Sequence, residues 1–312
     1  MTEQTDNQAN RKFDILGDIL ETIRFRGTVF FHAKLAAPWG ISFAPMKIPR
    51  FHIALSGECF IGTKDDQFLR LQQMEIAMIP TGNAHWVADQ PNSKLVESES
   101  VGEACELNRP MFQKGEITNL LMCGLVQYDE DTPHPIFDTL PDVLHFSEEL
   151  ISESTWSTIK LIDGEIQRKK NNSSPIIDRL TEALFLQLLE AYVERNEQDI
   201  GFFAALGDPR LKQALALIHH NPETNWTVTS LGKEIGMSKA TLNRHFQHTI
   251  GLTPIAYIKN WKMMKALNLA KYSSFSLEQV AEFVGFSSAR TLNKAFLRHY
   301  GYTPSHARKS AR

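Results

Sequence analysis

Side chains that can hydrogen-bond to base edges recur in the C-terminal third of the chain. Asn243 and Arg244 lie in one segment, and Arg290, Asn293 and Lys294 lie at similar positions in a second segment. Arginine can donate two hydrogen bonds to guanine, and asparagine can pair with adenine. The chemistry offered by these two segments is recognition of double-stranded DNA, with no catalytic group among them.

The two segments belong to an internal repeat with the signals of two helix-turn-helix units. In each copy a glycine, Gly236 or Gly285, ends a short helix where a positive φ is favoured. A serine that follows, Ser238 or Ser288, can cap the next helix through its hydroxyl. Leucine and phenylalanine at i and i+4 bury one face of that helix, and Gly-x-Thr-Pro stops it. The pattern predicts an all-helical domain over residues 208–312.

The face opposite the buried leucine and phenylalanine carries small, amide and cationic side chains. We expect this face, together with the two capping residues and their neighbours, to contact DNA. The candidate DNA-binding residues are Ser238, Lys239, Ala240, Thr241, Asn243, Arg244, Gln247, Ser288, Ala289, Arg290, Asn293 and Lys294.

The segment from about residue 210 to 309 resembles the DNA-binding domain of the AraC/XylS family of transcription regulators. The residues that carry the resemblance are Ala281, Gly285, Phe286, Ser288, Phe296, Gly301, Thr303, Pro304 and Arg308. The resemblance implies that residues 255–273 form a long helix joining the two units. Both recognition helices would then enter successive major grooves, about 34 Å apart. It also implies contact with RNA polymerase at promoters.

Charge is divided unequally along the chain. Residues 208–312 carry a net charge of +10 and residues 1–207 carry −13, although the whole chain carries only −3. Such asymmetry favours a polyanionic partner for the basic part, so we expect residues 208–312 to bind DNA with an affinity that falls steeply with salt. Three cysteines without metal-ligand spacing favour a reducing cytoplasm. No stretch approaches the ~20 apolar residues of a membrane helix, so no membrane partner is expected.

Short apolar runs bounded by turn residues mark the N-terminal half as rich in strands. The runs are Phe51–Leu55, Ile76–Ile79 and Asn119–Val126. They predict a barrel or sandwich over residues 15–146. The Pro-x-Gly-x-x-His element that ends at His85 resembles the second motif of the cupin fold. The segment Leu121–Gly124, with a later His134 and Pro135, resembles the cupin found in one AraC subfamily.

Four residues of this half are candidates for binding an effector. Metal-binding cupins use a His-x-His pair, but His52 is followed by Ala54, so that pair is absent. His52 and His85 would face each other across the barrel, and Glu58 would complete a two-histidine, one-carboxylate set. The alternative is a pair of hydrogen-bonded histidines that line a pocket. Cys123 is either an inert buried thiol or a sensor of oxidants or electrophiles. We expect no cofactor and no catalytic residue.

The remaining segments complete the expected organisation. Residues 1–14 are expected to be a disordered tail, and residues 197–207 a linker. Residues 147–196 have a helical period with a break near residue 173, which predicts an antiparallel helical pair that caps the barrel, forms a homodimer, or does both.

The sequence therefore predicts a mixed fold, with a cupin-like β-barrel and helical pair followed by an all-α domain of two helix-turn-helix units. The predicted function is sequence-specific DNA binding by a transcription regulator. A small-molecule or stress signal sensed in the barrel would control it. The alternative from another class is a metal-dependent cupin enzyme fused to a DNA-binding module.

Overall fold

The computed structural model of the chain divides into two bodies. It describes residues 15–46, 48–63, 68–107, 111–128, 136, 140–169, 174–195 and 200–310. One body, which we call the β-rich body, comprises residues 26–127 and 140–194; the helical body comprises the C-terminal residues from 195 onwards together with residues up to 25 and 128–139. No helix in the described part of the chain has the length and hydropathy needed to cross a bilayer. The expected tail, residues 1–14, lies outside the described residues.

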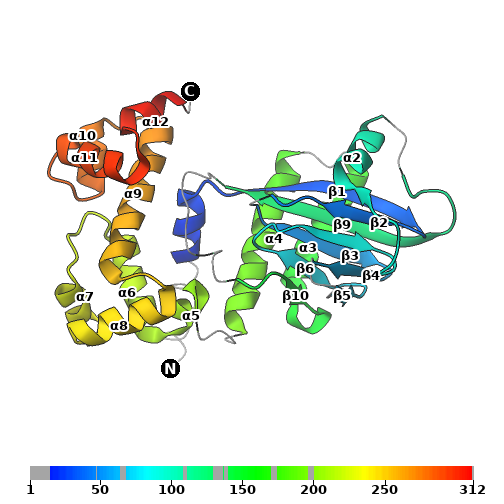
Figure 1. The fold of residues 1–312 in the computed structure, drawn as a ribbon, viewed down its shortest axis with the longest axis horizontal. Coiled ribbons are helices and arrows are strands. Elements are labelled where there is room, and N and C mark those ends of the chain that lie inside the picture. The colour runs from blue at the N-terminus through cyan, green and yellow to red at the C-terminus, as the bar shows by residue number, and fades with distance from the viewer. Residues whose placement is uncertain are drawn as a thin grey trace. The chain divides into compact units, whose positions relative to one another are not determined.

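Two five-stranded sheets form the frame of the β-rich body (Figure 1). The first sheet has the order β1 (Arg26–Ala36), β9 (Ile117–Gln127), β3 (Arg50–Ser56), β6 (Ile76–Ile79) and β10 (Leu144–Phe146). The second has the order β5 (Phe68–Leu71), β4 (Cys59–Gly62), β7 (His85–Ala88), β2 (Gly40–Phe43) and β8 (Val96–Glu97). The three predicted strands are therefore confirmed as β3, β6 and β9.

An apolar core lies between the sheets. It takes residues from both, among them Leu35 of β1, Ile61 of β4 and Val87 of β7. Among the described strands, hydrogen bonds do not join the two sheets into a closed ring. The predicted cupin-like fold is confirmed, but shared side-chain packing takes the place of a continuous barrel ladder.

Three helices complete the β-rich body: α2 (Ser98–Glu106), α3 (Glu153–Lys169) and α4 (Pro175–Glu194), with the short 3-10 helix η1 (Glu148–Leu150) before α3. Helices α3 and α4 form the predicted pair and lie against β1. A carboxylate oxygen of Asp163 lies 2.7 Å from the Nε2 atom of His32, and a carboxylate oxygen of Asp178 accepts a hydrogen bond from the Thr28 hydroxyl at 3.2 Å. Gly27 permits the approach of α4, because a Cβ there would lie 2.8 Å from the backbone nitrogen of Glu182.

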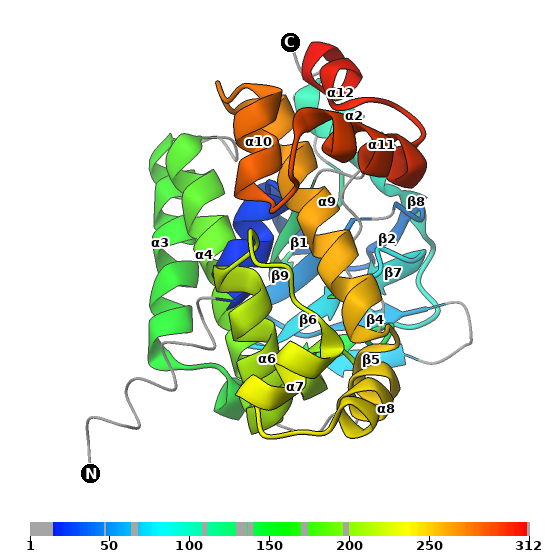
Figure 2. The same ribbon diagram turned by 90° about the vertical axis from the view of Figure 1, so that its left-hand side faces the viewer.

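The helical body consists mainly of α5 (Phe202–Gly207), α6 (Pro209–His220), α7 (Val228–Glu234), α8 (Lys239–Ile250), α9 (Pro254–Tyr272), α10 (Leu277–Phe283), α11 (Ala289–Tyr300) and α12 (Pro304–Ser310). Figure 2 shows the long helix α9 running between the pair α7–α8 and the pair α10–α11. The predicted all-α architecture, with a long joining helix between two helix-turn-helix units, is confirmed.

Part of the segment expected to be a linker is helical. Residues 196–199 lie outside the described residues, but α5 buries Phe202, Phe203 and Leu206. The phenyl ring of Phe202 stacks on that of Tyr257 at 6.3 Å. Helix α5 therefore contributes to the core of the helical body, because burying its apolar side chains is more favourable than leaving them in water.

A further helix of this body comes from the start of the chain. Residues 15–22 are helical, and Ile15, Ile19 and Ile23 are buried. Asn268 of α9 donates to the carbonyl oxygen of Thr22 at 2.8 Å. The sequence placed residues from 15 onwards with the barrel, whereas the first strand begins at residue 26 and residues up to 25 group with the helical body.

Candidate DNA-binding surface and effector site

The two candidate recognition helices are held by matched local devices. The hydroxyl of Ser238 accepts from the Thr241 backbone nitrogen at 3.1 Å, and that of Ser288 accepts from the Thr291 nitrogen at 3.3 Å. The preceding turn glycines, Gly236 and Gly285, have φ values of 67° and 74°. Capping residues and left-handed glycines fix where each helix begins, so the polar face of α8 and that of α11 are presented at equivalent positions.

Most of the predicted DNA-binding side chains are accessible. On α8, α11 and their N-caps the exposed ones are Ser238, Lys239, Ala240, Arg244, Gln247, Ser288, Arg290 and Lys294, and the half-buried ones are Thr241, Asn243, Ala289 and Asn293. Asn293 is the least available, because its Oδ1 atom is buried without a hydrogen-bond partner. On the opposite faces Leu242, Phe246, Leu292 and Phe296 are fully buried.

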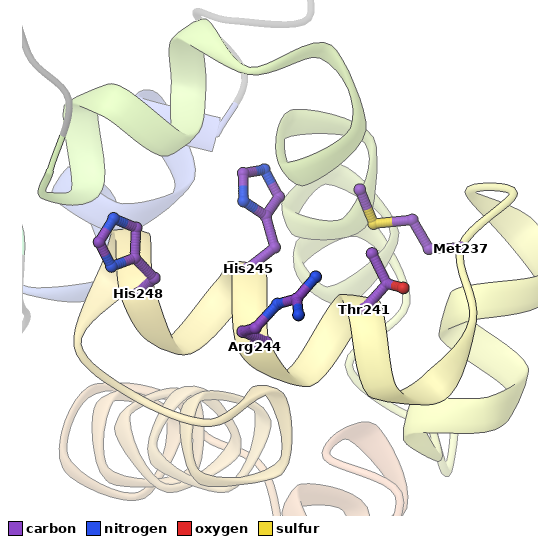
Figure 3. A pocket seen from close by; sticks show the side chains of 5 residues that line it. All are labelled: Met237, Thr241, Arg244, His245 and His248. Carbon is purple, nitrogen blue, oxygen red and sulfur yellow. The ribbon is translucent and has the colours of Figure 1, made fainter.

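A surface hollow of about 470 Å³ lies along α8, and we call it the α8 hollow. Figure 3 shows its lining: Met237 from the turn before the helix, and Thr241, Arg244, His245 and His248 from α8 itself. The Nε2 atom of His245 lies 2.8 Å from an Asp208 carboxylate oxygen. Arg244 is exposed at the edge of this hollow, so its guanidinium is accessible to a ligand.

The β-rich body holds a buried polar cluster of two histidines and a cysteine. His52 of β3 and Cys123 of β9 are cross-strand partners, and the Nδ1 atom of His52 lies 2.9 Å from the Cys123 sulfur. The Nε2 atoms of His52 and His85 lie 2.8 Å apart. The ring of Phe43 stacks on His85, with centroids 4.8 Å apart. The structure therefore brings together three of the four predicted effector residues.

The positions of the protons in this cluster follow from donor and acceptor counting. The Nδ1 atom of His85 lies 2.8 Å from the carbonyl oxygen of Asn83, which can only accept, so Nδ1 carries the hydrogen. A neutral His85 then accepts at Nε2, so His52 donates from its own Nε2. His52 in turn accepts at Nδ1 from the thiol of Cys123. The cluster is thus a chain of neutral hydrogen bonds with a defined direction.

Burial keeps every member of the cluster uncharged. Desolvation lowers the pKa of His85 to about 4, opposed by the bond to the Asn83 carbonyl and aided by the nearby Arg50 charge. Desolvation, then the neighbouring His85 and Arg50, lowers the pKa of His52 well below its usual value. Burial likewise raises the pKa of the Cys123 thiol well above its usual value. In this conformation the Cys123 sulfur stays protonated and donates a hydrogen bond to His52.

Glu58 does not join the histidines. It follows the turn after β3, is exposed, and pairs with Arg70 of β5. The structure therefore does not assemble the two-histidine, one-carboxylate set. Among the described residues, no group of three His, Cys, Asp or Glu side chains has a metal-binding arrangement.

Comparisons with known proteins give the family. A cupin family model matches residues 14–194, more than half of the chain, and a helix-turn-helix domain model matches residues 231–310. A putative AraC-like transcription regulator of Streptomyces lividans is 23% identical over 300 residues, which cover 95% of this chain and 98% of that protein. The chain belongs to the AraC family of transcription regulators. Like the AraC-type regulators it resembles, this protein combines an N-terminal cupin domain with a C-terminal helix-turn-helix domain, as the sequence predicted.

Relatives of this AraC-family chain match along its whole length. The HTH-type transcriptional regulator AlkR of Acinetobacter baylyi is 26% identical over 309 residues, which cover 96% of this chain and 100% of AlkR. The regulator MtrA of Neisseria gonorrhoeae is 23% identical over 304 residues, which cover 95% of this chain and 98% of MtrA. The crystal structure of the AdpA DNA-binding domain with target DNA is 28% identical; the match covers 34% of this chain and 94% of that one, with a TM-score of 0.32. The protein is a DNA-binding transcription regulator.

Other residues of this AraC-family protein carried no sequence signal for their place. Arg50 extends its guanidinium over the ring of Phe43 at 5.5 Å and donates to the carbonyl of Ala44. In the helical body, Asp18 accepts from His219 at 3.1 Å and pairs with Lys265 of α9. The partners in both groups are joined by tertiary packing, so spacing along the sequence does not indicate them.

Proposed function

We propose that the protein binds promoter DNA sequence-specifically through α8 and α11 and that a signal sensed in the cupin domain controls this binding or the activation that follows it. The observation that carries the DNA-binding assignment is the pair of capped helices, each with one buried face and one accessible face of cationic and amide side chains. Contact with RNA polymerase, and dimerisation or signal relay through α3 and α4, belong to the same proposal.

Arg244 provides the test of base recognition. It is exposed on α8 and has the geometry to donate two hydrogen bonds to guanine. Arg244→Ala should weaken binding of the full-length protein to its promoter by about 1–3 kcal/mol and relax the preference at one base pair. Lys309→Ala, at an exposed position of α12, serves as the control and should reduce specific and non-specific binding mildly and equally. Equal effects of the two substitutions would contradict base recognition by α8.

The sensing site we propose is the His52–His85–Cys123 cluster, with either an organic small molecule or an oxidant as the signal. The support is a fully satisfied buried hydrogen-bond chain, in which each neutral imidazole can exchange a partner for a ligand atom. For an oxidant, the candidate group is the thiol of Cys123, and because burial keeps this thiol protonated, that branch requires a change of conformation that exposes it.

A reporter gene driven by the protein's own promoter tests this site in cells. His85→Ala should abolish the response to the inducing signal while the purified full-length variant retains its DNA affinity. Glu58→Gln, a change at the exposed fourth candidate, is the matched control and should respond normally. Cys123→Ser separates the two branches: it removes the response to an oxidant and preserves the response to an organic effector. A normal response in the His85 variant would refute the assignment.

A further inference from the structure

A second hollow, of about 630 Å³, lies beside α11, and we call it the α11 hollow. It is lined by residues of α9, α11, the turn before α11 and the segment that leads into α7. Three cations contribute: Lys259 and Lys262 of α9, and Arg298 of α11. Among the described residues, none of the three makes an ion pair with a carboxylate.

Lys262 is unusual because it is only 8% exposed yet has no hydrogen-bond partner among the described residues. Burial lowers the pKa of Lys262, and the charge of the exposed Glu223 opposes this shift without outweighing it. Trp226, which also lines the hollow, buries its indole nitrogen without a partner. A lysine with so little solvent contact and no partner is costly to bury, and an anion in the hollow would accept from Lys262 and offset that cost.

The position of the hollow indicates which anion it would meet. Thr291 and Arg298 lie on the flank of α11 that borders the hollow, beside the face that carries Arg290 and Lys294. The major groove is about as wide as an α-helix with its side chains, so a helix inserted there has a sugar-phosphate strand along each flank. If α11 inserts with Arg290 and Lys294 towards the bases, the hollow must face one of these strands.

The internal repeat supports this geometry independently. Thr241, His245 and His248 line the α8 hollow, and the residues 50 positions later, Thr291, Ala295 and Arg298, line the α11 hollow. Both recognition helices therefore carry a hollow with basic side chains on the same flank. Two units that occupy successive major grooves of one duplex would present that flank to equivalent phosphates.

We propose that the α11 hollow is a seat for a backbone phosphate of the bound DNA, held by Lys262, Lys259 and Arg298. This inference rests on the proposed mode of DNA binding and adds a contact that sets affinity and register but carries no base preference. The buried, unpaired Lys262 acquires its partner only in the complex.

Anisotropy titration of the full-length protein with its labelled promoter duplex tests the seat. Lys262→Met nearly keeps the shape of the side chain and removes its charge, and Arg298→Gln removes a charge at an exposed position. Each should weaken specific and non-specific binding alike, by about tenfold for Lys262→Met. Each should also reduce the slope of log affinity against log salt by about 1. Lys309→Gln is the control away from the hollow. Without DNA, Lys262→Met should be no less heat-stable than the wild type.

A scan of neutral methylphosphonate linkages along the duplex then identifies the phosphate. One linkage should weaken wild-type binding yet have no additional effect on the Lys262→Met protein, whereas other linkages should act equally on both. If both variants keep the wild-type slope of log affinity against log salt, the proposed phosphate contact is refuted. Variants that lose binding of inorganic phosphate, measured by calorimetry, but keep their DNA affinity would also refute it, because the hollow would then hold a small anion. Failure of the wild type to prefer its promoter would instead refute the proposed function itself.

Discussion

The buried histidine pair makes the stability of the β-rich body depend on pH. In the folded protein burial lowers the pKa of His85 to about 4, whereas an unfolded chain titrates near the usual value of 6.5. Between these values the unfolded state binds more protons, so stability is complete above pH 6.5 and falls as the pH drops towards 4. At about 1.4 kcal/mol per pH unit, His85 alone accounts for about 3 kcal/mol. His52 contributes in the same direction.

Urea titrations of the full-length protein across this pH range measure the effect, with β3 and β7 peptides followed by pulsed hydrogen exchange and mass spectrometry. His85→Gln removes the titrating group but keeps an amide that can accept from His52, so its stability should vary much less between pH 6.5 and 4. His145→Gln changes a more exposed histidine of the same body and should keep the steep dependence. A wild-type β-rich body equally stable at pH 4.5 and 7 would refute the reasoning.

Two further predictions concern the helical body. Gly236→Ala should cost about 1 kcal/mol from its positive φ alone, and Gly285→Ala at least about 3 kcal/mol, because its Cβ would lie 2.0 Å from the Glu223 carbonyl oxygen. Hydrogen exchange of the flanking helices would show the difference, and equal losses would disprove the clash. Asp18→Ala should cost about 1.5–3 kcal/mol by leaving the Nδ1 atom of His219 and the ammonium of Lys265 without their carboxylate, seen as faster exchange of residues 15–22. Unchanged exchange would contradict this. Burial acts to raise the pKa of Asp18, but the bond from His219 and the lysine charge outweigh it and lower the pKa. In the wild type this stabilisation is therefore present above about pH 4 and is lost as the pH falls through the lowered pKa.

The helix-turn-helix repeat could be predicted because its signals are local. Serine caps, turn glycines and the i, i+4 apolar pairs act within a few residues of one another, so each unit can be recognised from the sequence alone. The repeat also fixed which face of α8 and α11 is buried. Asn293 is the exception, because the burial of its Oδ1 atom depends on packing that the local pattern does not show.

The histidine cluster required information that the sequence does not contain. His52 and Cys123 meet only because β3 and β9 pair in one particular register. Glu58 was grouped with the histidines because it is close in sequence, but the register shift between Ala54 and Ser56 and the turn at Gly57 precede it. Alternation of side chains between the two faces does not continue through a bulge and a turn, so the carboxylate lies outside, beside Arg70.

The boundary of the helical body shows a different limit of prediction from sequence. The sequence pattern predicts that this body begins at residue 208. Its described core, however, also contains α5 and the helix of residues 15–22. A fragment that starts at residue 208 would lose the stacking of Phe202 on Tyr257 and the bonds that Asp18 makes with His219 and α9. It would also expose the apolar surface against which these segments pack, which costs about 25 cal/mol for each Å² uncovered. Weak DNA binding by such a fragment would therefore reflect a missing part of the fold as readily as a missing DNA contact, so affinities must be compared in the full chain.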